Sequence, residues 1–204
     1  MLRQALEMAK RADITVIAGD IYDRPVPPAE AVSLFNAFLT DMHGQGSRVA
    51  MISGNHDSAE RIAFASGLLG ESGVYVSPVY DGAVRRVELA DAFGAVHLYL
   101  LPFIKPSHVR AALGNDEIEG YTAAMRAVIE TMALDENARN VLVAHQFVTG
   151  AATSDSEEVS VGGLDGVDAS VFAPFDYVAL GHLHRAQKLA GGRAVYSGSP
   201  VCYS

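Results

Sequence analysis

Four short apolar runs of this chain each end in polar side chains that could bind metal ions. The runs are rich in Val, Ile and Ala, which is typical of strands buried on both faces of a sheet. The residues that follow them supply a carboxylate, an amide oxygen and three imidazoles, namely Asp20, Asn55, His145, His182 and His184. In such sheets, functional groups gather beyond the carboxyl ends of the strands. We therefore predict that these five side chains converge from four distant stretches on a metal site.

Each cluster alone also has an ordinary structural explanation. Gly19-Asp20 could be a simple turn, and a lone histidine such as His145 is most often a core residue with satisfied hydrogen bonds. The pair His182 and His184 is more specific, because imidazoles at positions i and i+2 share one face of an extended chain and can chelate. The joint order of the four clusters favours a metal site. The other histidines match no motif and are predicted to be structural: His43, His97 and His108.

The composition predicts one domain over residues 1–204, since 204 residues that are 50% hydrophobic can bury a full core. No apolar run approaches the roughly 18 residues that cross a bilayer, and the N-terminus lacks a secretory pattern. The single cysteine, Cys202, cannot form an internal disulfide, which fits a reducing compartment. We expect a cytoplasmic protein with no membrane contact.

The net charge of −9 argues against a chain that holds nucleic acid by a broad basic face. An enzyme that acts on nucleic acid is not excluded. Two bound divalent cations would add about four positive charges inside the cleft. Tight binding to DNA would then depend mainly on a partner or on a further segment.

The apolar spacing also predicts the elements that position the clusters. A helix over 2–11 leads into a strand at 14–18, and a helix that begins near Pro28 and ends at Gly44 leads into a strand at 48–52. This β-α-β crossover implies parallel strands. Later elements are predicted as a helix at 61–66, a meander of strands at 73–76, 83–89 and 95–101 with a turn at 81–82, helices at 107–113 and 118–133, and strands at 141–144, 177–180 and 193–196. The polar stretch between 145 and 167 is either a lid or a solvated loop.

The order Gly-Asp, Gly-Asn-His-Asp, a lone His and Gly-His-x-His resembles the calcineurin-like metallophosphoesterases. Within that superfamily, the stretches 18–23, 53–58, 160–163 and 179–185 resemble the SbcD-like nuclease subunits, and the likeness runs over nearly the whole chain. The resemblance implies an α/β metallophosphoesterase fold, with two packed mixed β-sheets flanked by helices in α/β/β/α layers.

The same resemblance implies an activity. The implied enzyme is a hydrolase that cleaves DNA phosphodiester bonds by in-line attack of a metal-bridging hydroxide. It would act both as a double-strand exonuclease and as a single-strand or hairpin endonuclease. The implied partners are DNA and an SbcC-like ATPase subunit, in a homodimer within a heterotetramer that acts in DNA replication, repair and recombination.

The resemblance also assigns the metal ligands. Asp20 would bridge two ions about 3.5–4 Å apart. Asn55, His145 and His182 would complete one ion, and His184 would bind the other. Mixed oxygen and nitrogen ligands suit Mn²⁺, with Fe²⁺, Co²⁺ or Zn²⁺ as alternatives.

His56 is similar to the family's catalytic histidine, which lies by the scissile phosphate. Asp57 could hold its imidazole in the required tautomer or simply cap a loop. Asp23 could position the attacking water or stabilise a turn. Three arginines could contact phosphates or be solvated surface residues: Arg24, Arg61 and Arg185.

The chain also departs from the family pattern. Members normally begin with a strand ending in Asp-x-His, and no such motif precedes Asp20. We therefore expect one β-α unit, roughly 30 residues, to be missing before Met1. A DNA-contacting cap and an ATPase-docking segment are expected to be missing after Ser204. This predicts one well-formed metal site and one incomplete site that keeps only Asp20 and His184.

Two alternatives to a nuclease stay open at this stage. The chain could be a non-catalytic fragment that binds one metal ion and acts as a scaffold. It could also be a small-molecule phosphodiesterase or a protein phosphatase of the same superfamily.

Overall fold

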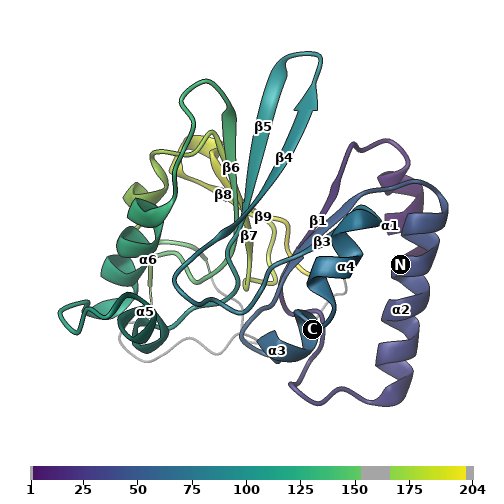
Figure 1. The fold of residues 1–204 in the computed structure, drawn as a ribbon, viewed down its shortest axis with the longest axis horizontal. Coiled ribbons are helices and arrows are strands. Elements are labelled where there is room, and N and C mark those ends of the chain that lie inside the picture. Colours follow the sequence, from purple (N-terminus) through teal and green to yellow (C-terminus); the bar gives the residue numbers. More distant parts are fainter. Residues whose placement is uncertain (1, 153–165, 201–204) are drawn as a thin grey trace.

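Two β-sheets pack face to face, with helices on both outer faces (Figure 1), in a computed structural model that describes residues 2–152 and 166–200. Helices α1 and α2 cover one sheet, and α5 and α6 cover the other. This four-layer arrangement confirms the predicted fold class. Residues 153–165 of the predicted lid or loop, which include the 160–163 motif, lie outside the described residues, as does Cys202.

The first sheet contains the strands that carry Asp20 and Asn55. Its strands, in spatial order, are β1 (Thr15–Ala18), β2 (Val49–Ile52) and β3 (Val74–Val76), all parallel. The outer face is covered by α1 (Leu2–Ala9) and α2 (Ala29–Gly44), whose Phe38 and Met42 are buried against the sheet. The β1–α2–β2 crossover is therefore parallel, as predicted.

The second sheet contains the strands that carry the histidines. Its spatial order is β4 (Arg85–Asp91), β5 (Gly94–Leu100), β6 (Arg139–His145), β7 (Tyr177–Gly181), β9 (Ala194–Tyr196) and β8 (Gln187–Leu189). The pairs β4–β5 and β8–β9 are antiparallel, and the remaining pairs are parallel. The outer face packs on α5 (Pro106–Leu113) and α6 (Gly120–Thr131). Two short 3₁₀ turns flank strands of this sheet: η1 (Ala169–Phe172) precedes β7, and η2 (Ala190–Gly192) joins β8 to β9.

The predicted meander is wrong, because its first strand belongs to the other sheet. β3 pairs in parallel with β2, so the segment containing Asp81-Gly82 crosses between the sheets instead of forming a hairpin turn. The hairpin is β4–β5, and it turns at residues 92–93. Local alternation of apolar residues cannot reveal which sheet supplies the partner strand, since both sheets offer the same pleated surface.

Two further elements differ from the prediction. The helix predicted at 61–66 is split into α3 (Ala59–Ile62) and α4 (Ser66–Glu71), because Ala65 between them has a φ of 55°, outside the helical range. Strand β8 is absent from the predicted set, since its three residues are too few to show a period.

The core between the sheets lies directly behind the predicted site. Ala50 and Ile52 of the first sheet pack with Leu98, Leu100 and Val143 of the second. The register aligns Ala18 with Ile52 in one sheet, and it aligns His145 with Gly181 in the other. The strand ends that carry the polar clusters are therefore held at one edge of the sandwich by apolar packing.

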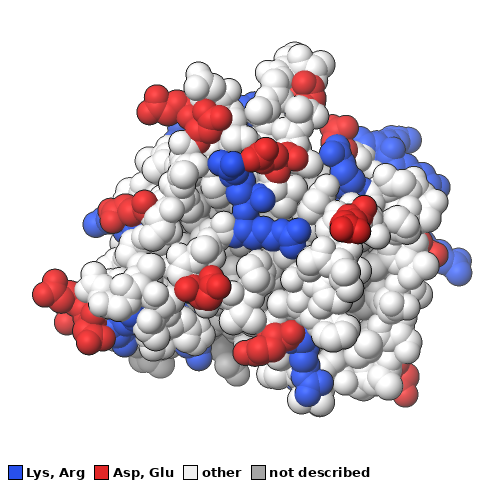
Figure 2. Space-filling model, in the orientation of Figure 1, with Lys and Arg blue, Asp and Glu red and all other residues white. Residues whose placement is uncertain are grey.

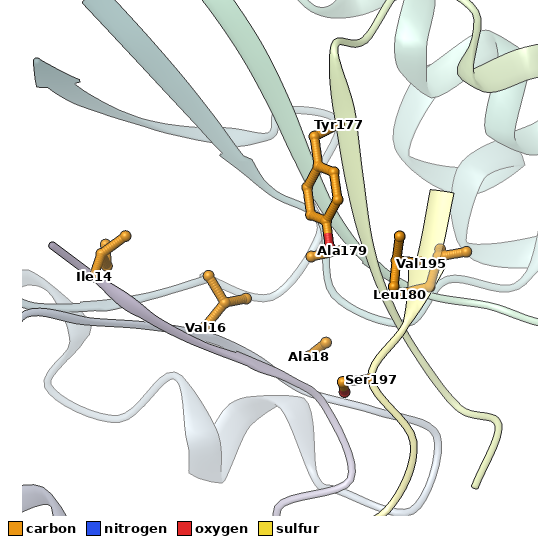
Figure 3. Close-up of a pocket in the computed structure, with 8 residues that line it drawn as sticks. All are labelled: Ile14, Val16, Ala18, Tyr177, Ala179, Leu180, Val195 and Ser197. Carbon is orange, nitrogen blue, oxygen red and sulfur yellow. The ribbon is translucent and has the colours of Figure 1, made fainter. Parts of the chain in front are cut away.

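An apolar groove of about 280 Å³ runs between the sheets beside β1 (Figure 3). Ile14, Val16 and Ala18 of the first sheet face Tyr177 and Ala179 of the second across it. Among the described strands, β1 pairs only with β2. This groove is therefore an edge of the inter-sheet core, lined by side chains without the chemistry of the polar clusters.

The surface carries mixed charge. On the face shown in Figure 2, Lys and Arg side chains are interspersed with Asp and Glu side chains, in keeping with the net charge of −9. No helix within residues 2–152 and 166–200 is both long and apolar enough to cross a bilayer.

Candidate metal centre

The ends of β1, β2, β6 and β7 bring four of the five predicted ligands together. Asp20, His145 and His182 offer one ligand atom each within 4.8 Å of one another. Oδ1 of Asn55 lies 3.0 Å from Nε2 of His145 and 3.0 Å from Nδ1 of His182. His184 is outside this group within the described part of the chain, and its carbonyl accepts a hydrogen bond from the backbone of Ser199.

The ring of His145 shows that the site fits a cation. Its Nδ1 lies 2.7 Å from the carbonyl oxygen of Ala18, and because a carbonyl only accepts, Nδ1 carries a proton. In the neutral ring, Nε2 then presents a lone pair, 3.1 Å from Oδ2 of Asp20 and 3.0 Å from Oδ1 of Asn55. Electron-rich atoms this close repel one another unless a proton or a cation lies between them. A histidine that donates its second ring N–H to a carbonyl is the usual metal-binding arrangement.

Burial keeps this histidine in place. The side chain of His145 is 1% exposed, and the ring of Phe103 meets it edge-on with 6.3 Å between ring centroids. The ring of His182 also lies against it, with 5.3 Å between the ring centroids and the two ring planes nearly perpendicular. Sequence reasoning missed Phe103 and the carbonyl of Ala18, because neither belongs to a polar cluster.

The carboxylate of Asp20 is ionised in this environment. Burial acts to raise its pKa. With a proton between Asp20 and His145 in place of a cation, the hydrogen bond and charge of His145, together with the backbone N–H of His56 at 3.1 Å, outweigh burial and hold the pKa below its ordinary value. An ionised carboxylate is the form that binds a divalent cation.

Two of the predicted ligands adopt uncommon backbone conformations. Asp20 has a φ of 49° and His182 a φ of 103°, and only two other non-glycine residues of the described chain have a positive φ. Such conformations persist only where the surroundings impose them, and they are frequent at functional sites. Asp and His are among the non-glycine residue types that adopt a positive φ most often, but residue type alone does not predict it at a given position.

The structure shows which groups hold His56 and Asp57 in place. Nδ1 of His56 lies 3.1 Å from the carbonyl oxygen of Asp23, so this backbone group orients the ring. The Asp57 carboxylate, which could either hold this ring or cap a loop, accepts hydrogen bonds from three backbone N–H groups: those of Ile21, Tyr22 and Gly54. A buried carboxylate accepts hydrogen bonds from turn N–H groups that have no other partner. The position of Asp57 next to His56 in the sequence could not reveal these contacts, because two of the donors follow β1.

The remaining predicted residues lie on the surface. The Asp23 carboxylate is exposed and pairs with Nη2 of Arg24 at 3.0 Å. Arg61, on α3, and Arg185, after β7, are both exposed. Their predicted contacts with phosphate stay predictions.

Comparison with known proteins agrees with this geometry. The model of the calcineurin-like phosphoesterase family matches residues 1–186. The chain is also similar to the SbcD subunit of the SbcCD nuclease from Staphylococcus epidermidis, with 34% identity over 199 residues. That alignment covers 96% of this chain and 52% of the relative, so the chain spans about half of the relative's length.

Proposed function

Since this chain belongs to the calcineurin-like phosphoesterase family, we propose that it is the catalytic core of a metal-dependent nuclease that hydrolyses DNA phosphodiester bonds. The observation that carries the proposal is the convergence of Asp20, Asn55, His145 and His182, with the lone pair of His145 turned toward two oxygen atoms. The name of the relative, a nuclease subunit, supports DNA as the substrate.

The residues divide unequally between two metal positions. Asp20, Asn55, His145 and His182 would hold one ion, and Asp20 and His184 would contribute to a second. Mn²⁺ suits this mixed set of oxygen and nitrogen ligands. Bound divalent ions lower the pKa of water and neutralise negative charge on a phosphate.

His56 is proposed to act on the phosphate. Nδ1 donates to the carbonyl of Asp23, so Nε2 is the ring nitrogen left to act on the phosphate. When protonated, Nε2 can donate a hydrogen bond to a phosphate oxygen or a proton to the leaving oxygen. Asp23 thus contributes through its backbone, while its carboxylate stays on Arg24.

The partners are proposed from the relative and from the surface charge. An SbcC-like ATPase subunit would supply much of the grip on DNA, because Lys and Arg are interspersed with acidic residues on the face in Figure 2. The assembly would be a homodimer within a heterotetramer. Its proposed activities are double-strand exonuclease and single-strand or hairpin endonuclease, in cytoplasmic DNA repair and recombination.

A Mn²⁺-dependent cleavage assay on the His56→Ala variant tests the proposal. We expect the cleavage rate to fall about 10²–10⁴-fold, the range for loss of a general acid. Mn²⁺ affinity, measured by calorimetry, should be unchanged, because His56 is outside the ligand group that the described residues form. The matched control is His43→Ala, an exposed histidine on α2 whose Nδ1 lies 3.0 Å from the Ser72 carbonyl oxygen, and this variant should cleave normally.

One observation favours the non-catalytic alternative, a one-metal scaffold. The described residues bring together a single group of ligands, and His184 is outside it. Binding of one Mn²⁺ per chain with no cleavage of DNA would support the scaffold. Turnover of model phosphodiesters or phosphoproteins far faster than DNA would instead favour a phosphodiesterase or phosphatase.

A further inference from the structure

We propose that Asp57 is a positioning residue that locks the two ligand loops after β1 and β2 into the geometry that binds the metal ion. The inference rests on the proposed metal-dependent function. Asp57 is 9% exposed, and its carboxylate lies among backbone N–H groups. Oδ2 accepts from Gly54 at 2.9 Å and from Ile21 at 3.1 Å, and Oδ1 accepts from Tyr22 at 2.9 Å.

These three donors belong to both loops. Ile21 and Tyr22 directly follow Asp20, and Gly54 directly precedes Asn55. The carboxylate of Asp57 therefore fixes the backbone that directly follows Asp20 and the backbone that directly precedes Asn55. Hydrogen bonds to an ionised acceptor are roughly twice as strong as neutral ones, so this contact is strong for its size.

The contact is reciprocal. Asp20, in the first loop, accepts the N–H of His56 in the second loop at 3.1 Å, while Asp57, in the second loop, accepts two N–H groups of the first. Asp20 also has a φ of 49°, a conformation that its surroundings must impose. Asp57 supplies that constraint, because it holds the two residues that follow Asp20.

The Asp57→Asn variant tests this role with almost no change in volume. Its amide nitrogen would replace one carboxylate oxygen and cannot accept, so one or two of the three hydrogen bonds are lost and N–H groups are placed against each other. We expect the Kd for Mn²⁺ to rise about 10–100-fold, the range for loss of a residue that orients metal ligands. The measurement is titration calorimetry without DNA, well below the melting temperature, on protein shown by circular dichroism to be folded.

The matched control is Asp176→Asn. The Asp176 carboxylate also accepts a backbone N–H, that of Asn140 at 2.8 Å, but at the opposite end of β6 from His145. Its Kd for Mn²⁺ should equal that of the wild type. A Kd for Asp57→Asn within about twofold of the wild-type value would overturn the proposal.

A measurement on the wild type keeps the inference testable if Asp57→Asn does not fold. In the metal-free protein, the amides of Ile21, Tyr22 and Gly54 should exchange with solvent slowly, as hydrogen-bonded amides of one rigid unit do. Exchange at the rate of open loops would overturn the proposal. Because neither readout involves DNA, absence of nuclease activity would refute the proposed function and leave this inference standing.

Discussion

At the scale of single residues, the proposed metal centre requires glycine at positions 54 and 181 as well as the predicted ligands. A Cβ on Gly54 would overlap the carboxylate of Asp20, and a Cβ on Gly181 would overlap the carbonyl oxygen of Ala18 and crowd the ring of His145. Gly54 lets the loops after β1 and β2 of the first sheet approach each other, and Gly181 lets β7 of the second sheet approach β1, so that the predicted ligands can meet. Their place beside the ligands in sequence is therefore a steric requirement.

We expect Gly181→Ala to destabilise the fold by about 1–3 kcal/mol, the range for overpacking, because the new methyl group meets backbone that cannot rotate away. It should also weaken Mn²⁺ binding, since β1 carries both Ala18 and the loop to Asp20. Chemical denaturation and calorimetry measure the two effects. Gly67→Ala is the control, because open space surrounds that position in α4 within the described part of the chain. Equal stability of Gly181→Ala and wild type would contradict the expectation.

At the scale of elements, one ion pair joins the start of β6 to the β4–β5 hairpin. Nη2 of Arg139 lies 2.6 Å from Oδ1 of Asp91 and 3.0 Å from the carbonyl oxygen of Gly94. These two residues flank the hairpin turn, so the guanidinium fixes the turn relative to the strand that ends in His145. The hydrogen bond from Arg139 holds the pKa of Asp91 below its ordinary value.

This pair predicts a pH-dependent stability. Because the pKa of Asp91 is lower in the folded chain than its ordinary value of 3.8, the stabilisation is present above that value and lost as pH falls through the folded pKa. We expect Asp91→Asn to lower the melting temperature slightly at pH 7 and not at all in strong acid. High salt should shrink the difference at pH 7, because both side chains are solvent-accessible. A difference that is the same at both pH values would exclude the ion pair as its cause.

At the scale of the whole molecule, the proposed metal ion joins the two sheets. Asp20 and Asn55 follow strands of the first sheet, and His145 and His182 lie at strand ends of the second. A divalent ion bound here would therefore also stabilise the fold, since it would crosslink two sheets that otherwise meet through apolar packing.

Mn²⁺ should accordingly raise the melting temperature of the protein. At a free concentration 100 times the Kd, binding to the folded state alone stabilises it by about 2.7 kcal/mol. Scanning calorimetry with Mn²⁺, and then with excess chelator, measures the shift and its reversal. Asp20→Asn should remove the shift by weakening binding more than about 100-fold, beyond the effect of residues that only orient ligands. A shift of equal size in Asp20→Asn would mean that Mn²⁺ binds elsewhere.

Much of the fold was predictable from local patterns. The periods of apolar residues located α2, α5, α6 and most strands, because helix and strand each imprint their own repeat on the sequence. The polar residues at strand ends likewise pointed to one edge of the sheets, since a parallel β-α-β unit directs carboxyl ends the same way.

The sequence by itself determined which residues could serve as ligands and on which strands they lie. Only the tertiary structure decided that β3 joins the first sheet, that the carbonyl of Ala18 orients His145, and that Asp57 binds the loop of Asp20 and not the ring of His56. The physical reason is range. Periodicity and turn chemistry act over a few residues, whereas these contacts join groups 127 and 36 positions apart and depend on how two sheets pack.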